Sequence, residues 1–109
     1  MKLEVLHVPE CPSTAVLSER LETLIVGRAD VLIERRVIRD QAEAVARGMR
    51  GSPTLLIDGT DPFAVAGQSP SLSCRLYVDE VGAVSGAPSP AQLRTALAAA
   101  ATRARPRTR

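Results

Sequence analysis

The chain has 109 residues, of which 45% are apolar and 24% charged, so it is long enough for one domain with a buried core but not for two. Phe63 and Tyr77 are the only aromatic residues, which excludes a base-stacking platform for single-stranded nucleic acid. The sequence has no run of about 18 apolar residues, which excludes a membrane-spanning helix. We therefore expect no nucleic-acid partner and no membrane. Because the first residues do not resemble an export signal, we expect a cytoplasmic location.

The net charge of +2 hides an uneven distribution of charge. Four of the fourteen basic residues are the arginines at positions 103, 105, 107 and 109. The rest of the chain carries ten basic and twelve acidic residues and is slightly acidic. We expect a folded domain over residues 1–101 and a basic, disordered tail over residues 102–109, because chain ends that are not tied down by packing are usually disordered.

The first predicted strand covers residues 3–8, which are mostly apolar, and ends at Pro9. Pro12 suits the first turn of a helix, where its missing N–H costs nothing. Apolar residues then recur at helical spacing and form one stripe, and Gly27 is a plausible end of the helix. The stripe consists of Leu17, Leu21, Leu24 and Ile25.

Residues 31–38 predict a second strand whose charged middle is typical of a position near the edge of a sheet. Asp40 and Glu43 then form the sequence signature of a capping box, which predicts a second helix. That helix should end near Gly48 or Gly51, since glycine favours the backbone conformation that follows a helix.

Residues 52–57 predict a third strand, with Pro53 at its start, where a missing N–H is tolerated. A long loop over residues 59–71 follows, rich in Gly, Pro, Ser and Asp. Residues 72–78 predict a fourth strand, and Ser89 is a plausible cap of a last helix. One face of the fourth strand would consist of Leu72, Cys74, Leu76 and Val78.

The element order β-α-β-α-β-β-α predicts an α/β fold. The first crossover should be right-handed and should connect parallel strands. The last two strands are close enough in sequence to pair antiparallel. We therefore predict one mixed four-stranded sheet with helices on both faces.

Cys11 lies where the first strand meets the first helix. Free N–H groups and the helix dipole stabilise a thiolate at such a position, and a thiolate is the reactive form of cysteine. Thr14 is placed to donate a hydrogen bond to the sulfur, whereas a charged Glu10 beside it would oppose ionisation. Cys11 is therefore a candidate nucleophile, with an inert cysteine at the helix start as the alternative.

Residues 9–14 (Pro-Glu-Cys-Pro-Ser-Thr) resemble the active-site loop of glutaredoxins, and residues 51–54 (Gly-Ser-Pro-Thr) resemble the cis-proline loop of the thioredoxin family. Together with the element order, these motifs make residues 1–101 similar to a thioredoxin-like fold. The resemblance implies a cis peptide bond before Pro53. It also implies a catalytic Cys11 assisted by Thr14, and substrate contacts made by Pro12, Ser52 and Pro53.

A closer resemblance is to small actinobacterial proteins of the thioredoxin family, some of which carry the name alkylmercury lyase. They share the Cys-Pro and Gly-Ser-Pro-Thr motifs, and also Asp-Pro-Phe-Ala (here 61–64) and Leu-Ser-Cys-Arg-Leu-Tyr (here 72–77). The second cysteine of a dithiol loop is replaced by Thr14. The glycine pair of glutathione-binding relatives and the loop of iron–sulfur relatives are missing, and no zinc-ligand spacing occurs. We expect no cofactor and no bound metal.

Two interpretations of Cys74 remain open. It lies in an alternating apolar run, where a free cysteine packs well as a small buried residue. Alternatively, it is a distant resolving thiol for Cys11, which requires the two Cα atoms to lie within about 7 Å of each other.

The residues favour three functional hypotheses. The first is a thiol–disulfide oxidoreductase or thiol-adduct protein whose partner is a thiol or disulfide substrate, either a protein or a small molecule. Here the backbone of Ser52 pairs with an extended substrate as an added strand would. The second is an organomercurial lyase or mercury-binding protein in which Cys11 and Cys74 bind mercury and Asp61 or Glu10 supplies a proton. The third is a non-catalytic binding module on the same scaffold.

Overall fold

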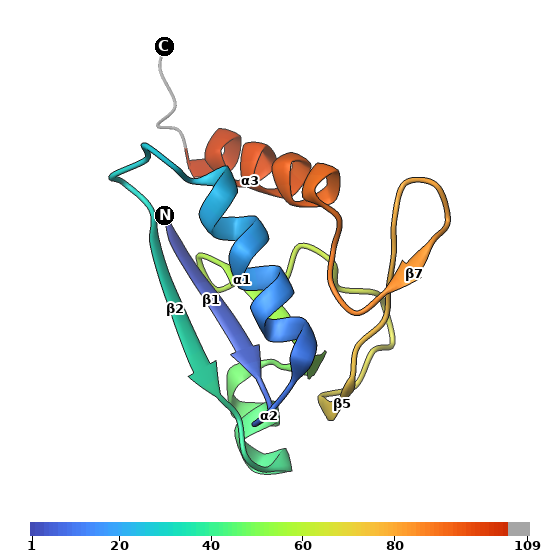
Figure 1. Cartoon of the computed structure of the whole chain (residues 1–109). Coiled ribbons are helices and arrows are strands. Elements are labelled where there is room, and N and C mark those ends of the chain that lie inside the picture. Colours follow the sequence, from blue (N-terminus) through green and yellow to red (C-terminus); the bar gives the residue numbers. More distant parts are fainter. Residues whose placement is uncertain (105–109) are drawn as a thin grey trace.

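The computed structural model of the chain describes residues 1–104, in which three helices surround a small set of strands (Figure 1). Strands β2, β1 and β4 form a mixed sheet in that order, with β2 parallel and β4 antiparallel to β1. The remaining strands form two separate two-stranded sheets, β3–β5 and β6–β7. In chain order the elements are β1 (Lys2–His7), α1 (Pro12–Leu24), β2 (Leu32–Val37), α2 (Gln41–Arg47), β3 (Arg50–Ser52), β4 (Thr54–Ile57), β5 (Ser71–Cys74), β6 (Tyr77–Val78), β7 (Val84–Ser85) and α3 (Pro90–Ala104).

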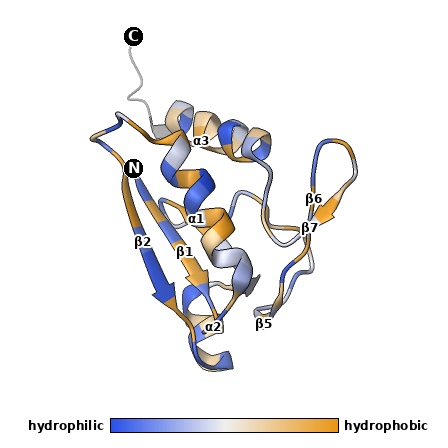
Figure 2. Ribbon diagram, in the orientation of Figure 1, coloured by the Kyte–Doolittle hydropathy of each residue, from blue (hydrophilic) through white to orange (hydrophobic). Residues whose placement is uncertain are grey.

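The predicted α/β class and the mixed sheet are confirmed, and apolar clusters lie on both faces of the sheet. Because successive strand residues point to opposite faces, Leu3 and Val5 of β1 join one cluster and Leu6 joins the other. The first cluster includes residues of α1 and α3, and the second includes Ala44 of α2. The charged strand β2 lies at an edge of the sheet, as predicted, and is the most hydrophilic strand in Figure 2.

The predicted four-stranded sheet is wrong in one respect, because β5 does not join it. The third predicted strand is divided at Pro53 into β3 and β4, and β5 pairs with β3. This pairing is parallel rather than antiparallel. The connection over residues 58–70 is long enough to carry the chain back to run parallel to β3, which a tight hairpin cannot do.

The predicted apolar face of residues 72–78 is also wrong. Cys74 is exposed and Leu76 is 69% exposed, whereas Arg75 and Tyr77 are each only 5% exposed. The backbones approach so closely that a Cβ atom added to Gly51 would lie 2.8 Å from the Cβ of Arg75. Arg75 is buried because it finds a partner on another segment, which the alternation of apolar residues does not reveal.

Both predicted helix caps are confirmed. The Glu43 N–H donates to Asp40 Oδ1 (2.8 Å), and Gly48 ends α2 in the left-handed conformation. At α3, the Gln92 N–H donates to Ser89 Oγ (3.1 Å), and the Ser89 N–H donates to Gln92 Oε1 (2.9 Å). These reciprocal bonds satisfy N–H groups that a helix start leaves free.

Helix α3 continues through residues 102–104, so the predicted start of the tail at residue 102 is wrong. The buried stripe of α3 ends earlier, at Ala100, and residues 101–103 are exposed. The remainder of the predicted tail, residues 105–109, lies outside the described residues. Within residues 1–104 no helix has the length and apolar character needed to cross a membrane.

Replacing Leu93 in α3 by alanine should lower the free energy of unfolding by about 2–5 kcal/mol. Leu93 is fully buried, so its removal leaves a cavity between α3 and the sheet. Leu76→Ala is the matched control, because that leucine is largely exposed and its loss should change stability by no more than about 0.5 kcal/mol. Urea denaturation followed by circular dichroism measures the free energy of unfolding of both variants. Equal losses of stability would contradict the assignment of Leu93 to the core.

Candidate functional site

Cys11 is the N-cap residue of α1 and is partly buried. Its backbone is extended, and its carbonyl accepts a hydrogen bond from the Thr14 N–H (3.2 Å). Just before it, Glu10 has a φ of 59°, so the chain turns sharply between β1 and α1. This turn places the Cys11 sulfur beside the free N–H groups of the first helical turn.

Ser52 lies beside Cys11 although it is 41 positions away in the sequence. It is buried, and the Val8 N–H donates a hydrogen bond to its Oγ (3.0 Å). Because this oxygen already accepts from Val8, its own proton is available to the Cys11 sulfur. The Ser52–Pro53 peptide bond is cis, as the resemblance implies, and Pro53 is fully buried.

Cys11 has a lowered pKa even though burial acts to raise it. The hydroxyl of Ser52 is the strongest of the groups that lower this pKa, followed by the hydroxyl of Thr14. The backbone N–H groups of Ser13 and Thr14 act in the same direction. Hydrogen bonds to the charged form outweigh desolvation here, so the thiolate is favoured.

Thr14 occupies the place of the second cysteine of a dithiol loop. Its side chain is buried, and its Oγ1 has no hydrogen-bond partner among residues 1–104. It nevertheless lies close enough to the sulfur to lower the pKa of Cys11. Glu10 is exposed and is not among the groups that shift this pKa, so the expected opposition from its charge is not found.

Cys74 also borders Ser52. In the parallel pairing of β3 with β5, Ser52 and Cys74 are register partners, and strands of a sheet lie about 4.8 Å apart. Both cysteines are free thiols, Cys11 partly buried and Cys74 exposed. The interpretation of Cys74 as a buried core residue is therefore wrong. The long connection before β5 brings the second thiol to the strand that carries Ser52.

The backbone carbonyl of Ser52 is already paired. The Arg75 N–H donates to it (3.0 Å), so the expectation that this carbonyl is exposed and pairs with an extended substrate is wrong. This contact could not be predicted from the sequence, because it depends on the unexpected partner of β5.

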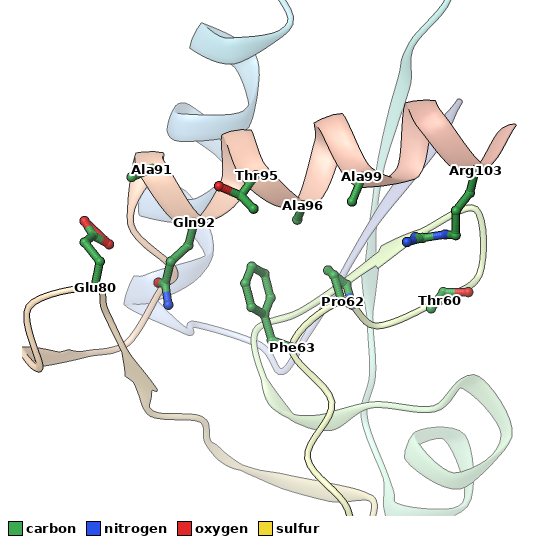
Figure 3. A pocket seen from close by; sticks show the side chains of 10 residues that line it. All are labelled: Thr60, Pro62, Phe63, Glu80, Ala91, Gln92, Thr95, Ala96, Ala99 and Arg103. Atoms are coloured by element: carbon green, nitrogen blue, oxygen red, sulfur yellow. The ribbon is translucent and has the colours of Figure 1, made fainter. Parts of the chain in front are cut away.

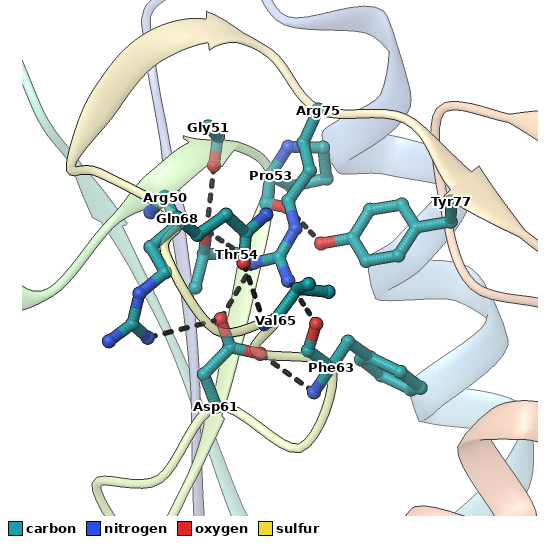
Figure 4. A network of polar contacts seen from close by, with 10 residues as sticks. All are labelled: Arg50, Gly51, Pro53, Thr54, Asp61, Phe63, Val65, Gln68, Arg75 and Tyr77. Carbon is teal, nitrogen blue, oxygen red and sulfur yellow. Dashed lines mark hydrogen bonds and ion pairs between the residues drawn. The ribbon is translucent and has the colours of Figure 1, made fainter.

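Beneath these residues lies a buried network centred on Arg75 (Figure 4). Its guanidinium forms an ion pair with Asp61 (2.7 Å) and also donates to Thr54 Oγ1 (3.2 Å) and to the carbonyl of Phe63 (2.8 Å). Asp61 accepts a further hydrogen bond from the Phe63 N–H (2.9 Å), and Arg50 lies 3.6 Å from its carboxylate. The sequence suggests Asp61 as a proton donor and does not reveal that Arg75 is buried. Both residues nevertheless stand in the shared motifs, at 61–64 and 72–77.

Tyr77 connects this network to the cis-proline loop. Its hydroxyl donates a hydrogen bond to the Pro53 carbonyl, and its ring packs edge-on against Phe63, with 5.7 Å between centroids. Burial raises the pKa of Tyr77 far above its usual value, although the nearby Arg75 guanidinium opposes this. The charges of Asp61 and, more weakly, of Cys11 raise the pKa of Tyr77 further, so the phenol remains a neutral donor.

A separate groove of about 460 Å³ lies between α3 and residues 60–63 (Figure 3). Pro62 and Phe63 face α3 across it, with Glu80 toward one end and Arg103 toward the other. It contains no cysteine or histidine, so it does not carry thiol chemistry. Across residues 1–104, no group of three or more His, Cys, Asp and Glu side chains is arranged so that it could hold a metal ion.

Comparisons of the chain with protein-family models, with curated proteins and with solved structures find no match. The coordinates therefore define the class on their own. The chain is an α/β protein with a mixed sheet, in which a cysteine of lowered pKa stands at the start of a helix and faces the hydroxyl of Ser52.

Ser52→Ala should raise the pKa of Cys11, because it removes the strongest hydrogen bond to the thiolate. The rate of alkylation by iodoacetamide should then reach its plateau at a higher pH than in the parent protein. The parent protein and the Ser52→Ala variant both also carry Cys74→Ser, so that only Cys11 can be alkylated. Ser73→Ala, an exposed serine on β5, is the control and should leave the midpoint unchanged. An unchanged midpoint in folded Ser52→Ala would contradict this account of the pKa.

Asp61→Asn should lower the free energy of unfolding by about 3–5 kcal/mol, since it leaves the buried charge of Arg75 without a counterion. The control is Asp30→Asn, which breaks the exposed Arg28–Asp30 pair (3.7 Å) and should cost no more than about 1 kcal/mol. Urea denaturation measures both. A loss at Asp61 no larger than that at Asp30 would show that the buried network does not stabilise the fold.

Proposed function

We propose that the chain has a thioredoxin-like fold and acts as a thiol–disulfide oxidoreductase or thiol-adduct protein with Cys11 as its nucleophile. The observation that carries the proposal is the lowered pKa of Cys11 at the start of α1, which increases the thiolate fraction at neutral pH. The element order and the mixed sheet with β2 parallel and β4 antiparallel to β1 support the thioredoxin-like assignment.

In the first step the Cys11 thiolate attacks one sulfur of a disulfide. A new S–S bond forms to Cys11, the old S–S bond breaks, and one thiolate leaves and takes a proton from water. In the second step the Cys74 thiolate attacks the Cys11 sulfur, which releases the second thiol and leaves a Cys11–Cys74 disulfide. Two electrons pass from the protein dithiol to the substrate, and two equivalents of a thiol reductant restore the protein.

The neighbouring residues have distinct roles in this proposal. Ser52 and Thr14 stabilise the thiolate through their hydroxyls. Pro53 is buried and positions Ser52 rather than touching the substrate with its ring. Pro12 is exposed next to Cys11, so direct contact with a substrate falls to Pro12 and Cys74.

The other two hypotheses have less support in the geometry. An organomercurial lyase needs an acid that can reach a carbon bound to mercury. Asp61 is buried, and its carboxylate is held by Arg75, Arg50 and the Phe63 N–H, while Glu10 is exposed on the turn before Cys11. A non-catalytic binding module does not require the donors that lower the pKa of Cys11.

Cys11→Ser should abolish reaction with a model disulfide at neutral pH, because it removes the nucleophile. Cys74→Ser should retain the first step and accumulate a stable mixed disulfide, since the resolving thiol is missing. Intact-mass spectrometry at fixed times distinguishes the mixed disulfide from the intramolecular one. Faster reaction of Cys74 than of Cys11, or an alkylation midpoint for Cys11 at or above that of a free thiol, would contradict the proposed function.

A further inference from the structure

The backbone edge of β3 is filled by the chain itself. The Ser71 N–H donates to the Met49 carbonyl (3.0 Å), and the Arg75 N–H donates to the Ser52 carbonyl (3.0 Å). Between these bonds, Arg50 is in register with Ser71. An extended peptide binds to a sheet by hydrogen bonding to such an edge. Strand β5 thus occupies the position beside Ser52 that a polypeptide substrate would need.

Strand β5 is also firmly held there. Gly51 lies so close to the Cβ atom of Arg75 that any larger residue at this position would push the strands apart. The head of Arg75 is anchored in its buried ion pair with Asp61. A peptide that displaced β5 would have to separate this pair or expose it to water, which is unfavourable for buried charges.

The other flank of the helix start is confined as well. A Cβ atom added to Gly86 would overlap the hydroxyl of Ser13, so the chain near β7 lies directly against the first turn of α1. Cys11, two residues before Ser13, is partly exposed, and Cys74 is exposed on β5. A substrate that reaches Cys11 therefore finds no free strand edge at Ser52 to pair with.

We propose that the Cys11 site acts on low-molecular-weight disulfides and thiol adducts and that β5 excludes extended polypeptides; this inference rests on the proposed thiol function. A small disulfide gives up one thiolate to the solvent when Cys11 attacks, and the remaining half stays bound as the mixed disulfide. Cys74 then displaces that half as a second thiol. The thiol that completes the exchange is thus that of Cys74, on the strand that pairs with Ser52.

The test compares two disulfides with the Cys74→Ser variant of the full chain, which stops at the mixed disulfide. One is bis(2-hydroxyethyl) disulfide, and the other is a linear peptide that carries the same thiol on a central cysteine. Each rate constant is divided by that of free cysteine with the same disulfide at the same pH. We expect this ratio to be at least tenfold larger for the small disulfide.

A ratio for the peptide equal to or above that for the small disulfide would overturn the substrate class while leaving the thiol function intact. Failure of both disulfides to react faster than with free cysteine would instead reject the proposed function together with the inference. The two failures are thus distinguishable in one experiment.

Gly51→Ala tests the part assigned to β5. The added methyl group would meet Arg75 at 2.8 Å and should loosen β5, which should raise the ratio for the peptide. Gly82→Ala is the matched control, because Gly82 also has a positive φ (85°) but nothing within 4 Å of the added atom. An unchanged peptide ratio in folded Gly51→Ala would contradict exclusion by β5.

Hydrogen exchange at the Arg75 amide gives a second readout that needs no altered glycine. In the small-thiol adduct of Cys74→Ser this amide should remain as protected as in the free protein, because its bond to the Ser52 carbonyl is kept. Rapid formation of the peptide adduct with loss of protection at Arg75 would show that a polypeptide displaces β5, and would overturn the inference.

Discussion

The buried ion pair between Arg75 and Asp61 is the interaction on which the arrangement of the site depends. Neither charge is stable inside a protein without the other, so the pair fixes where the connection over residues 58–70 meets β5. The same guanidinium reaches Thr54, directly after the cis-proline loop, and lies 4.8 Å from the centre of the Tyr77 ring. One side chain therefore joins β4, the connection that follows it and β6.

From this network a short series of contacts leads to the thiol. Tyr77 holds the Pro53 carbonyl, Pro53 positions Ser52, and Ser52 hydrogen-bonds toward Cys11 while it accepts from the Val8 N–H. Partial burial alone would raise the pKa of Cys11. The lowered pKa therefore depends on how accurately the core places one serine hydroxyl, and not only on the helix start that the sequence reveals.

The features that could be predicted from the sequence are those decided by neighbouring residues. The caps at Asp40 and Ser89, the proline at the start of α1 and the charged edge strand β2 each depend on residues within one or two turns of each other. The pairing of β5 could not be predicted in this way. Its spaced apolar residues favour the wrong face, because the burial of Arg75 depends on a carboxylate 14 positions away.

In the proposed chemistry, the separation of the two thiols onto different elements gives them different tasks. Thr14 stands where a dithiol loop has its second cysteine, and it contributes a hydroxyl donor rather than a second thiol. The donors at the start of α1 therefore serve a single thiolate. Cys74 lies exposed on β5, next to Ser52 but away from that helix turn. In the proposed chemistry this asymmetry sets the order of events: Cys11 attacks first because its pKa is lowered, and Cys74 follows from the strand that also limits the size of the substrate.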